Sequence, residues 1–128
     1  MAAIQKVAWT YAWPLNSFDK AADTLLRYSK DAGLDNNNIV QLKVNAVDYL
    51  MRMNPQQKAK AIQLMEECIT LDNLHAESII GSRTTLAGMI HSTDKARADK
   101  LFKEALDACT NQNQRYRVCN HAAGVKRE

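Results

Sequence analysis

The side chains best suited to nucleophilic or metal chemistry in this sequence are three cysteines and three histidines: Cys68, Cys109, Cys119, His75, His91 and His121. The cysteines are odd in number, and no two of them have the close spacing of a zinc motif. Cys109 and Cys119 lie ten residues apart near His121, so a metal site, an oxidised pair and two free thiols are the alternatives. The spacing favours free thiols, with Cys109 and Cys119 accessible and Cys68 buried. Reduced cysteines in turn favour a cytoplasmic protein.

No local motif assembles a catalytic site. The sequence has no phosphate-binding loop, no glycine-rich dinucleotide turn and no His-Glu-x-x-His stretch. The three histidines fall near the ends of predicted helices, where they cap a last turn or lie in solvent. We therefore expect a protein that is not an enzyme and that binds no cofactor and no metal.

The composition favours a single all-helical domain over residues 1–128. Hydrophobic residues make up 46% of the chain, and only 4 glycines and 2 prolines interrupt it, which leaves room for long helices. The apolar runs are far shorter than the roughly 18 residues that a membrane span needs. The N-terminal stretch MAAIQKVAWTYAW also lacks a basic leader, so we expect no membrane insertion.

The charge distribution disfavours nucleic acid as a partner. The net charge is +3, with 8 basic and 5 acidic residues in residues 1–64 and 9 of each in residues 65–128. Neither half has the strongly basic face that a phosphate backbone requires. The basic C-terminal end is a solvated helix face or, as the alternative, a contact for phosphates or acidic lipids; it comprises Arg115, Tyr116, Arg117, Lys126 and Arg127.

A repeated stretch determines the predicted architecture. KAKAIQLMEEC at residues 58–68 returns 37 residues later as KARADKLFKEA at residues 95–105, with five positions identical. The shared small and bulky residues fall at i, i+3, i+4 and i+7, which is one face of a helix. We expect that face to be buried in each copy: Ala61, Leu64, Met65 and Cys68, then Ala98, Leu101, Phe102 and Ala105, with a looser copy at Ala22, Leu25, Leu26 and Ser29.

Helix start and stop signals divide the chain into three helical hairpins. Pro14 ends a first helix, Gly33 ends a second, and the turn DNNN at residues 35–38 precedes a third. Asn54 and Pro55 then combine a cap with a first-turn proline. The predicted hairpins are residues 2–33, 37–71 and 75–109, and a short C-terminal helix covers residues 114–122.

The stretches AKAIQLMEECITLDNLHAES and RADKLFKEALDACTNQ resemble the second helix and exit turn of a tetratricopeptide repeat. In that family alanine, a bulky residue and another small residue recur at this spacing. The period here is 37 to 39 residues, against about 34 in the family, and Asn73 stands where proline is common. The resemblance implies three stacked antiparallel hairpins in a short right-handed α-solenoid, whose first helices line a concave surface that holds peptides or partner domains.

The first helices carry a polar stripe that would line this surface. The third helix, in IVQLKVNAVDYLMRM, is mostly apolar, and its polar positions are spaced 4, 3 and 4 residues apart. Moving by the repeat offsets gives the corresponding positions of the fifth and first helices. The predicted groove for a peptide or partner consists of Gln41, Asn45, Asp48 and Arg52, then Ser78, Ser82 and Thr85, then Lys6, Trp9 and Trp13.

Trp9 and Trp13 lie one helical turn apart. They either cap the end of the hydrophobic core or act as exposed anchors for a ligand. In the second case the N-terminal aromatic end would also support weak self-association. The chain begins inside a predicted helix, which favours an excised repeat domain of a larger protein.

Two functions fit these patterns. The first is a non-catalytic protein–protein interaction module, a scaffold or adaptor that binds a protein or peptide partner through the concave groove. The second is an accessory or regulatory repeat domain of a larger enzyme or membrane-associated assembly, which packs against its parent chain. A polar groove favours the first function, and exposed tryptophans favour the second.

Overall fold

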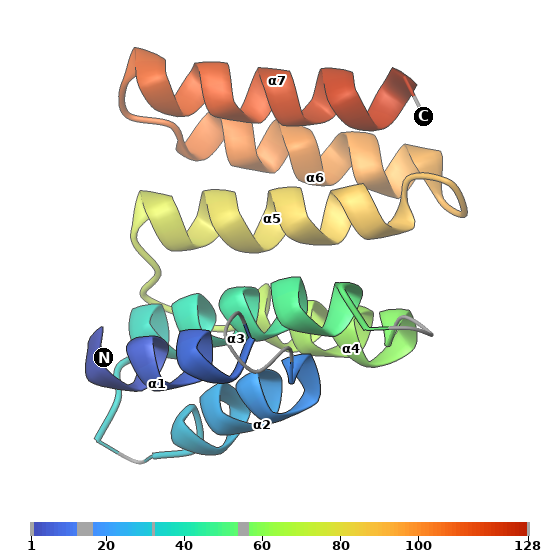
Figure 1. Ribbon diagram of the computed structural model, residues 1–128. Helices are drawn as coiled ribbons and strands as arrows, with labels where there is room; N and C mark the ends of the chain where they lie inside the picture. The colour runs from blue at the N-terminus through green and yellow to red at the C-terminus, as the bar shows by residue number, and fades with distance from the viewer. Residues whose placement is uncertain (1, 13–16, 32, 54–56, 128) are drawn as a thin grey trace. The chain divides into compact units, whose positions relative to one another are not determined.

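The computed structural model describes residues 2–12, 17–31, 33–53 and 57–127, which form helices and turns without a strand. The protein is therefore all-α, as the sequence predicts. None of the described helices is both long and apolar enough to cross a membrane. The helices are α1 (Ala2–Ala12), α2 (Phe18–Tyr28), α3 (Asn36–Met51), α4 (Lys58–Cys68), α5 (Ala76–Ile90), α6 (Lys95–Ala108) and α7 (Gln112–Arg127) (Figure 1).

The chain divides into two compact units, residues 1–64 and residues 65–128, and the boundary falls within α4. Both units contain fully buried apolar side chains, such as Leu25 and Leu42 in the first and Leu86 and Val118 in the second. Each unit therefore has a core of its own. The expectation of one domain over the whole chain stays a prediction.

Unit 1 packs α1 against α2 and α2 against α3, with successive helices antiparallel (Figure 1). α1 buries Ala8 and Ala12 completely. Of the predicted face of the second helix, Ala22, Leu25 and Ser29 are buried, whereas Leu26 is half-buried. Because alanine side chains are short, the backbones of α1 and α2 can lie close together.

α3 begins at a side-chain cap and buries most of its surface. The carboxylate of Asp35 accepts a hydrogen bond from the backbone N–H of Asn38 at 2.9 Å, which satisfies one of the free donors at the helix start. The ring of Tyr49 stacks on Phe18 of α2, with 6.4 Å between the ring centroids. The buried residues of α3 are Val40, Leu42, Ala46, Val47, Tyr49 and Leu50.

Unit 2 packs α5, α6 and α7 against one another, with α6 antiparallel to α5 and α7 antiparallel to α6 (Figure 1). The repeated face of α6 is buried as predicted, at Ala98, Leu101, Phe102 and Ala105. In the earlier copy Ala61, Met65 and Cys68 are fully buried, whereas Leu64 is only half-buried. The prediction for Leu64 is therefore wrong in degree, because this residue lies at the edge of the buried face.

Gly88 allows a close approach between α5 and α7. A β-carbon at Gly88 would lie 3.0 Å from Nε2 of His121, which is tighter than almost all real contacts of this kind. The His121 ring also lies against Phe102 of α6, with 5.9 Å between the ring centroids. A residue without a side chain therefore lets one histidine contact both neighbouring helices.

The end of α2 differs from the prediction. α2 ends at Tyr28, five residues before Gly33, and the chain continues in a turn. The Ser29 hydroxyl donates a hydrogen bond to the carbonyl of Leu26 at 2.6 Å, and the N–H of Lys30 donates to the carbonyl of Arg27. These shorter-range bonds replace the helical ones, so no glycine is needed to stop the helix.

α7 is longer than the predicted residues 114–122. It starts earlier because Oδ1 of Asn111 accepts a hydrogen bond from the N–H of Gln114 at 2.9 Å and caps the helix. It also continues past Gly124, since an isolated glycine in a helix costs only about 1 kcal/mol relative to alanine. The predicted caps Asn54 and Pro55 of the fourth helix lie outside the described residues.

Asn73 has a left-handed backbone, with φ of 60°. It lies in the turn between α4 and α5, at the position where the tetratricopeptide pattern commonly has proline. Asparagine adopts positive φ more readily than most residues, whereas the proline ring fixes φ near −65°. The backbone at this position therefore suits asparagine and excludes proline.

Candidate functional site

A narrow polar surface runs along α3 in unit 1. We call Gln41, Asn45, Asp48 and Arg52 the α3 polar stripe, because their spacing of 4, 3 and 4 residues places them on one helix face. Within α3 only Gln41 and Asp48 are exposed, and Arg52, the residue that caps the helix end, is exposed as well. Asn45 is half-buried between them. The stripe is the part of this helix that solvent reaches most.

The charges of the α3 polar stripe form an exposed pair. Nε of Arg52 lies 3.3 Å from Oδ2 of Asp48, and the two side chains are 44% and 62% exposed. Exposed pairs four residues apart on a helix contribute only about 0.3–0.5 kcal/mol, so a ligand carboxylate can displace Asp48 at small cost. The guanidinium also presents further donors in a planar fork, which suits a carboxylate held by two bonds.

Tyr49 lies beside this pair on the buried side of α3. Burial raises the pKa of the Tyr49 phenol, the negative charge of Asp48 raises it further, and Arg52 opposes them. The hydroxyl is therefore neutral at physiological pH and contributes no charge to the stripe.

The predicted positions on α5 are less open than those on α3. Ser82 is fully buried, and its hydroxyl donates to the carbonyl of Ser78 at 2.8 Å while it accepts from the guanidinium of Arg83 at 3.1 Å. Ser78 and Thr85 are half-buried. Ser82 thus departs from the expectation of an open groove residue, because serine in a helix can satisfy its hydroxyl on the preceding turn.

Arg83 connects α5 to the chain that follows α4. Its guanidinium donates to the carbonyl of Ile69 at 3.2 Å as well as to Ser82. The sequence pattern did not single out this arginine, because the residues it contacts depend on how the turn after α4 folds back. Its role in unit 2 is structural.

On α1, Lys6 and Trp9 are exposed, and 52% of the Trp9 surface is open to solvent. Val7 beside it is 46% exposed. Trp13 lies outside the described residues. Of the two alternatives for the tryptophans, the exposure of Trp9 favours a contact with something outside unit 1 over a place in its core.

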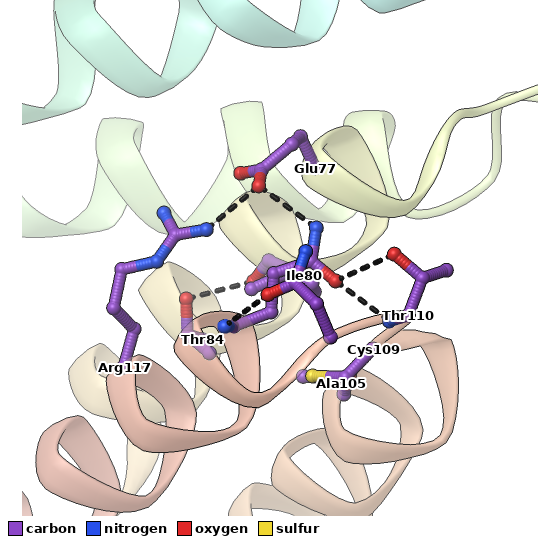
Figure 2. Close-up of polar contacts among 9 residues, drawn as sticks. Glu77, Ile80, Thr84, Ala105, Cys109, Thr110 and Arg117 are labelled. Atoms are coloured by element: carbon purple, nitrogen blue, oxygen red, sulfur yellow. Dashed lines mark hydrogen bonds and ion pairs between the residues drawn. The ribbon is translucent and has the colours of Figure 1, made fainter.

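A polar cluster in unit 2 joins the start of α5 to the start of α7 (Figure 2). Oε1 of Glu77 accepts hydrogen bonds from Arg117 at 2.6 Å and from the Gln114 amide at 2.9 Å. The carbonyl oxygen of the buried Gln114 side chain in turn accepts from the N–H of Thr110 at 2.7 Å and from its hydroxyl at 3.1 Å. Hydrogen bonding to Arg117 and Gln114 lowers the pKa of Glu77, and the same ion pair raises the pKa of Arg117.

This cluster was not predicted from the sequence. Glu77 and Arg117 are forty residues apart, so no local pattern relates them. The only signal was the start of α7, where Asn111 and Gln114 have the spacing of a helix cap and its third-residue partner. Because both polar groups of Gln114 are bonded within unit 2, the cluster fixes the start of α7.

The three cysteines are free thiols. Cys68 is buried, as predicted. Cys109 is also buried, with Sγ donating to the carbonyl of Ala105 at 3.3 Å, so the expectation of an accessible Cys109 is wrong (Figure 2). Cys119 is exposed. Within the described ranges no three histidine, cysteine or acidic side chains come together to hold a metal ion.

In comparisons with protein-family models, curated proteins and solved structures, nothing matches this chain.

Proposed function

We propose that the protein is a non-catalytic protein–protein interaction module, a scaffold or adaptor that binds a peptide or partner domain through the α3 polar stripe. The observation that carries the proposal is the restriction of exposed residues on α3 to Gln41 and Asp48, followed at its end by Arg52. Polar groups on the one open face of a mostly buried helix keep hydrogen-bonding capacity for a partner. The proposal requires no cofactor and no catalytic group.

The spacing of the stripe suits an extended peptide. Successive stripe residues rise by about 4.5–6 Å along the helix, since each residue adds about 1.5 Å. An extended chain repeats every second residue, at about 6.6–6.8 Å, so its backbone groups can meet successive stripe side chains. Gln41 and Asn45 each offer both donors and an acceptor to such a backbone. Arg52 would hold a carboxylate of the partner with two bonds.

The architecture we propose around this surface is a short right-handed α-solenoid of three stacked antiparallel hairpins, similar to tetratricopeptide repeats. The repeated buried face of α4 and α6 and the antiparallel order within each unit support it. We also propose a cytoplasmic location, which the three free thiols favour.

The second candidate is an accessory repeat domain of a larger enzyme or membrane-associated assembly. It is favoured by one observation, the exposure of the large apolar side chain of Trp9 on α1. Tryptophan is enriched at contact surfaces, because a partner can remove its large ring from water. In this case the parent chain covers α1, and the same surface supports weak self-association of the isolated protein.

The test of the first candidate starts from random peptides displayed with free C-terminal carboxylates. The affinity of the peptides enriched on the wild-type protein is then measured by fluorescence anisotropy for wild type, Arg52→Ala and Asn45→Ala. We expect each variant to weaken binding at least about fivefold, because an arginine–carboxylate contact and a lost amide partner are each worth about 1–3 kcal/mol.

Arg27→Ala is the matched control for Arg52→Ala. Arg27 of α2 also pairs with an aspartate four residues earlier, Asp23, at 2.7 Å, and its side chain is exposed, at 80% against 44% for Arg52. This variant loses the same kind of ion pair outside the α3 polar stripe, so peptide binding should be unchanged. Enriched peptides that bind Arg52→Ala as well as wild type would place the partner surface elsewhere, with Trp9 as the next residue to test.

A further inference from the structure

A groove of about 400 Å³ lies between α6 and α7 in unit 2. Its apolar lining includes Phe102 and Leu106 from α6 and Val118 and Ala122 from α7. Leu106 is one of the exposed large hydrophobic residues of the protein, with 36% of its surface open. Asp99 and Lys103 of α6 add charged groups to this lining. Because the groove lies outside the α3 polar stripe, its role is independent of the proposed function.

The internal repeat shows what covers the equivalent residues one copy earlier. The offset of 37 residues places Lys103 and Leu106 where the first copy has Glu66 and Ile69. There the surface is partly covered: the Glu66 carboxylate, whose side chain is 39% exposed, is held by Arg97 in the first turn of α6, at 3.0 Å and 2.5 Å. The carbonyl of Ile69 is held by Arg83 of α5. In the first copy, therefore, the residue equivalent to Lys103 contacts a following amphipathic helix.

The sign of the charge is reversed in the second copy. Glu66 pairs with the cation of Arg97, whereas the equivalent residue of the second copy is itself a cation, Lys103, which attracts an anion. We propose that the groove between α6 and α7 binds an amphipathic helix of a partner protein. That helix resembles α6 in its small and bulky apolar face but carries an aspartate or glutamate in its first turn, opposite Lys103. An acidic residue in that turn is also favoured by the helix dipole.

A second copy of this chain fits the groove less well. The other exposed large hydrophobic residues of the described chain are Val7 and Trp9 on α1 and Tyr116 on α7. Neither helix has an acidic residue, so neither offers a carboxylate to Lys103. The acidic first turn of α2 contains Asp19, but the apolar face of α2 is already buried within unit 1.

The probe is a synthetic peptide with the sequence of residues 94–108 and the change Arg97→Glu. A lactam between Lys100 and Glu104, both exposed on α6, keeps the peptide helical without altering the face that packs. The comparison peptide is identical but keeps Arg97. On the full chain, measured by fluorescence anisotropy, we expect the Arg97→Glu peptide to bind at least about fivefold more tightly, since the change replaces a repulsion by an attraction.

Variants of the protein provide the decisive comparison. Lys103→Glu should reverse the preference, so that the peptide with Arg97 binds more tightly. Leu106→Ser should weaken both peptides, and Lys100→Glu, an exposed charge outside the groove lining, should leave the preference unchanged. Circular dichroism and the melting temperature check that each variant is folded, and all of these positions are exposed enough to tolerate the change.

Three results would overturn the proposal. They are equal binding of the two peptides, a preference that Lys103→Glu does not reverse, and no binding of either peptide at millimolar concentration. Sedimentation of the protein alone gives a fourth: self-association that Leu106→Ser abolishes would show that the groove binds a second copy of the chain.

Discussion

The guanidinium of Arg97 binds both carboxylate oxygens of Glu66, although the two residues are 31 positions apart. This bidentate pair joins the last turn of α4 to the first turn of α6 within unit 2. Hydrogen bonding to Glu66 raises the pKa of Arg97, so the guanidinium keeps its positive charge at alkaline pH. A residue of the first repeated stretch, 58–68, therefore contacts a residue of the second, 95–105, within the same chain.

We expect a coupling energy of about 0.5–1 kcal/mol between Glu66 and Arg97 in a double-mutant cycle with alanine, measured by urea unfolding. Both side chains are 39% exposed, so solvent screening limits the value and added salt should reduce it. The exchanged pair Glu66→Arg with Arg97→Glu should recover most of the loss. If the losses of unfolding free energy in the two single variants simply added up in the double variant, the pair would not stabilise the protein.

Leu101→Ala should destabilise the protein by about 2–5 kcal/mol, because it removes a buried leucine from the face of α6. Leu101 is 3% exposed. Leu64 occupies the same position in the first copy but is half-buried, so Leu64→Ala should cost clearly less. Urea unfolding of both variants checks the order, and a larger loss for Leu64→Ala would contradict the burial of these two leucines.

Cys119 should be the only cysteine of the native protein that reacts rapidly with an alkylating reagent. Cys68 and Cys109 are buried, whereas Cys119 is exposed on α7. Peptide mapping after a short pulse identifies the labelled thiol, and labelling in urea provides the reference for three accessible thiols. Rapid labelling of Cys109 in the native protein would show that this thiol is not shielded at the end of α6.

Asn73→Gly should destabilise the protein least of three substitutions at this position, because glycine adopts positive φ without steric cost. Asn73→Ala should cost about 1–2 kcal/mol, the penalty of a β-carbon in left-handed backbone. Asn73→Pro should cost more, since a φ of 60° is closed to the proline ring. Thermal unfolding ranks the three variants, and a proline variant as stable as wild type would rule out the left-handed turn.

The ionised Glu77 side chain should stabilise the protein at neutral pH, and this contribution should be lost in acid. Its pKa is lowered in the folded protein, so the stabilisation from its ionised form is fully present above the ordinary value of 4.5 and is lost as pH falls through the lowered value. The difference in unfolding free energy between wild type and Glu77→Gln should therefore shrink as pH falls below 4.5 and through the lowered pKa. The effect is small, because the side chains of Glu77 and Arg117 are both 60% exposed.

Glu104→Gln is the control for this pH series. Glu104 is an exposed carboxylate on α6, so its removal tests the general loss of one negative charge. Its difference from wild type should change little across the same range. If the difference in unfolding free energy between wild type and Glu77→Gln did not change with pH, the polar cluster between α5 and α7 would not form in solution.

The helical face of the repeat was predictable from the sequence, because the spacing of Ala98, Leu101, Phe102 and Ala105 is a local property of one helix. The stripe positions on α3 were predictable for the same reason. Ser82 was not, since a polar residue in a sequence does not reveal whether its hydroxyl bonds to its own helix. Cys109 was not either, because its burial depends on how α7 folds back onto α6.

α1 buries only small side chains among those that the structure describes, namely Ala8 and Ala12. A buried alanine removes far less apolar surface from water than the leucines and valines that hold α2 and α3. The free energy that keeps α1 in place is correspondingly low, so this helix should detach and reattach while the rest of unit 1 stays folded. Its backbone amides would then exchange with deuterium well before those of α3. Each such opening would expose the facing side of α2, so a partner that holds Trp9 would also slow the exchange of that helix.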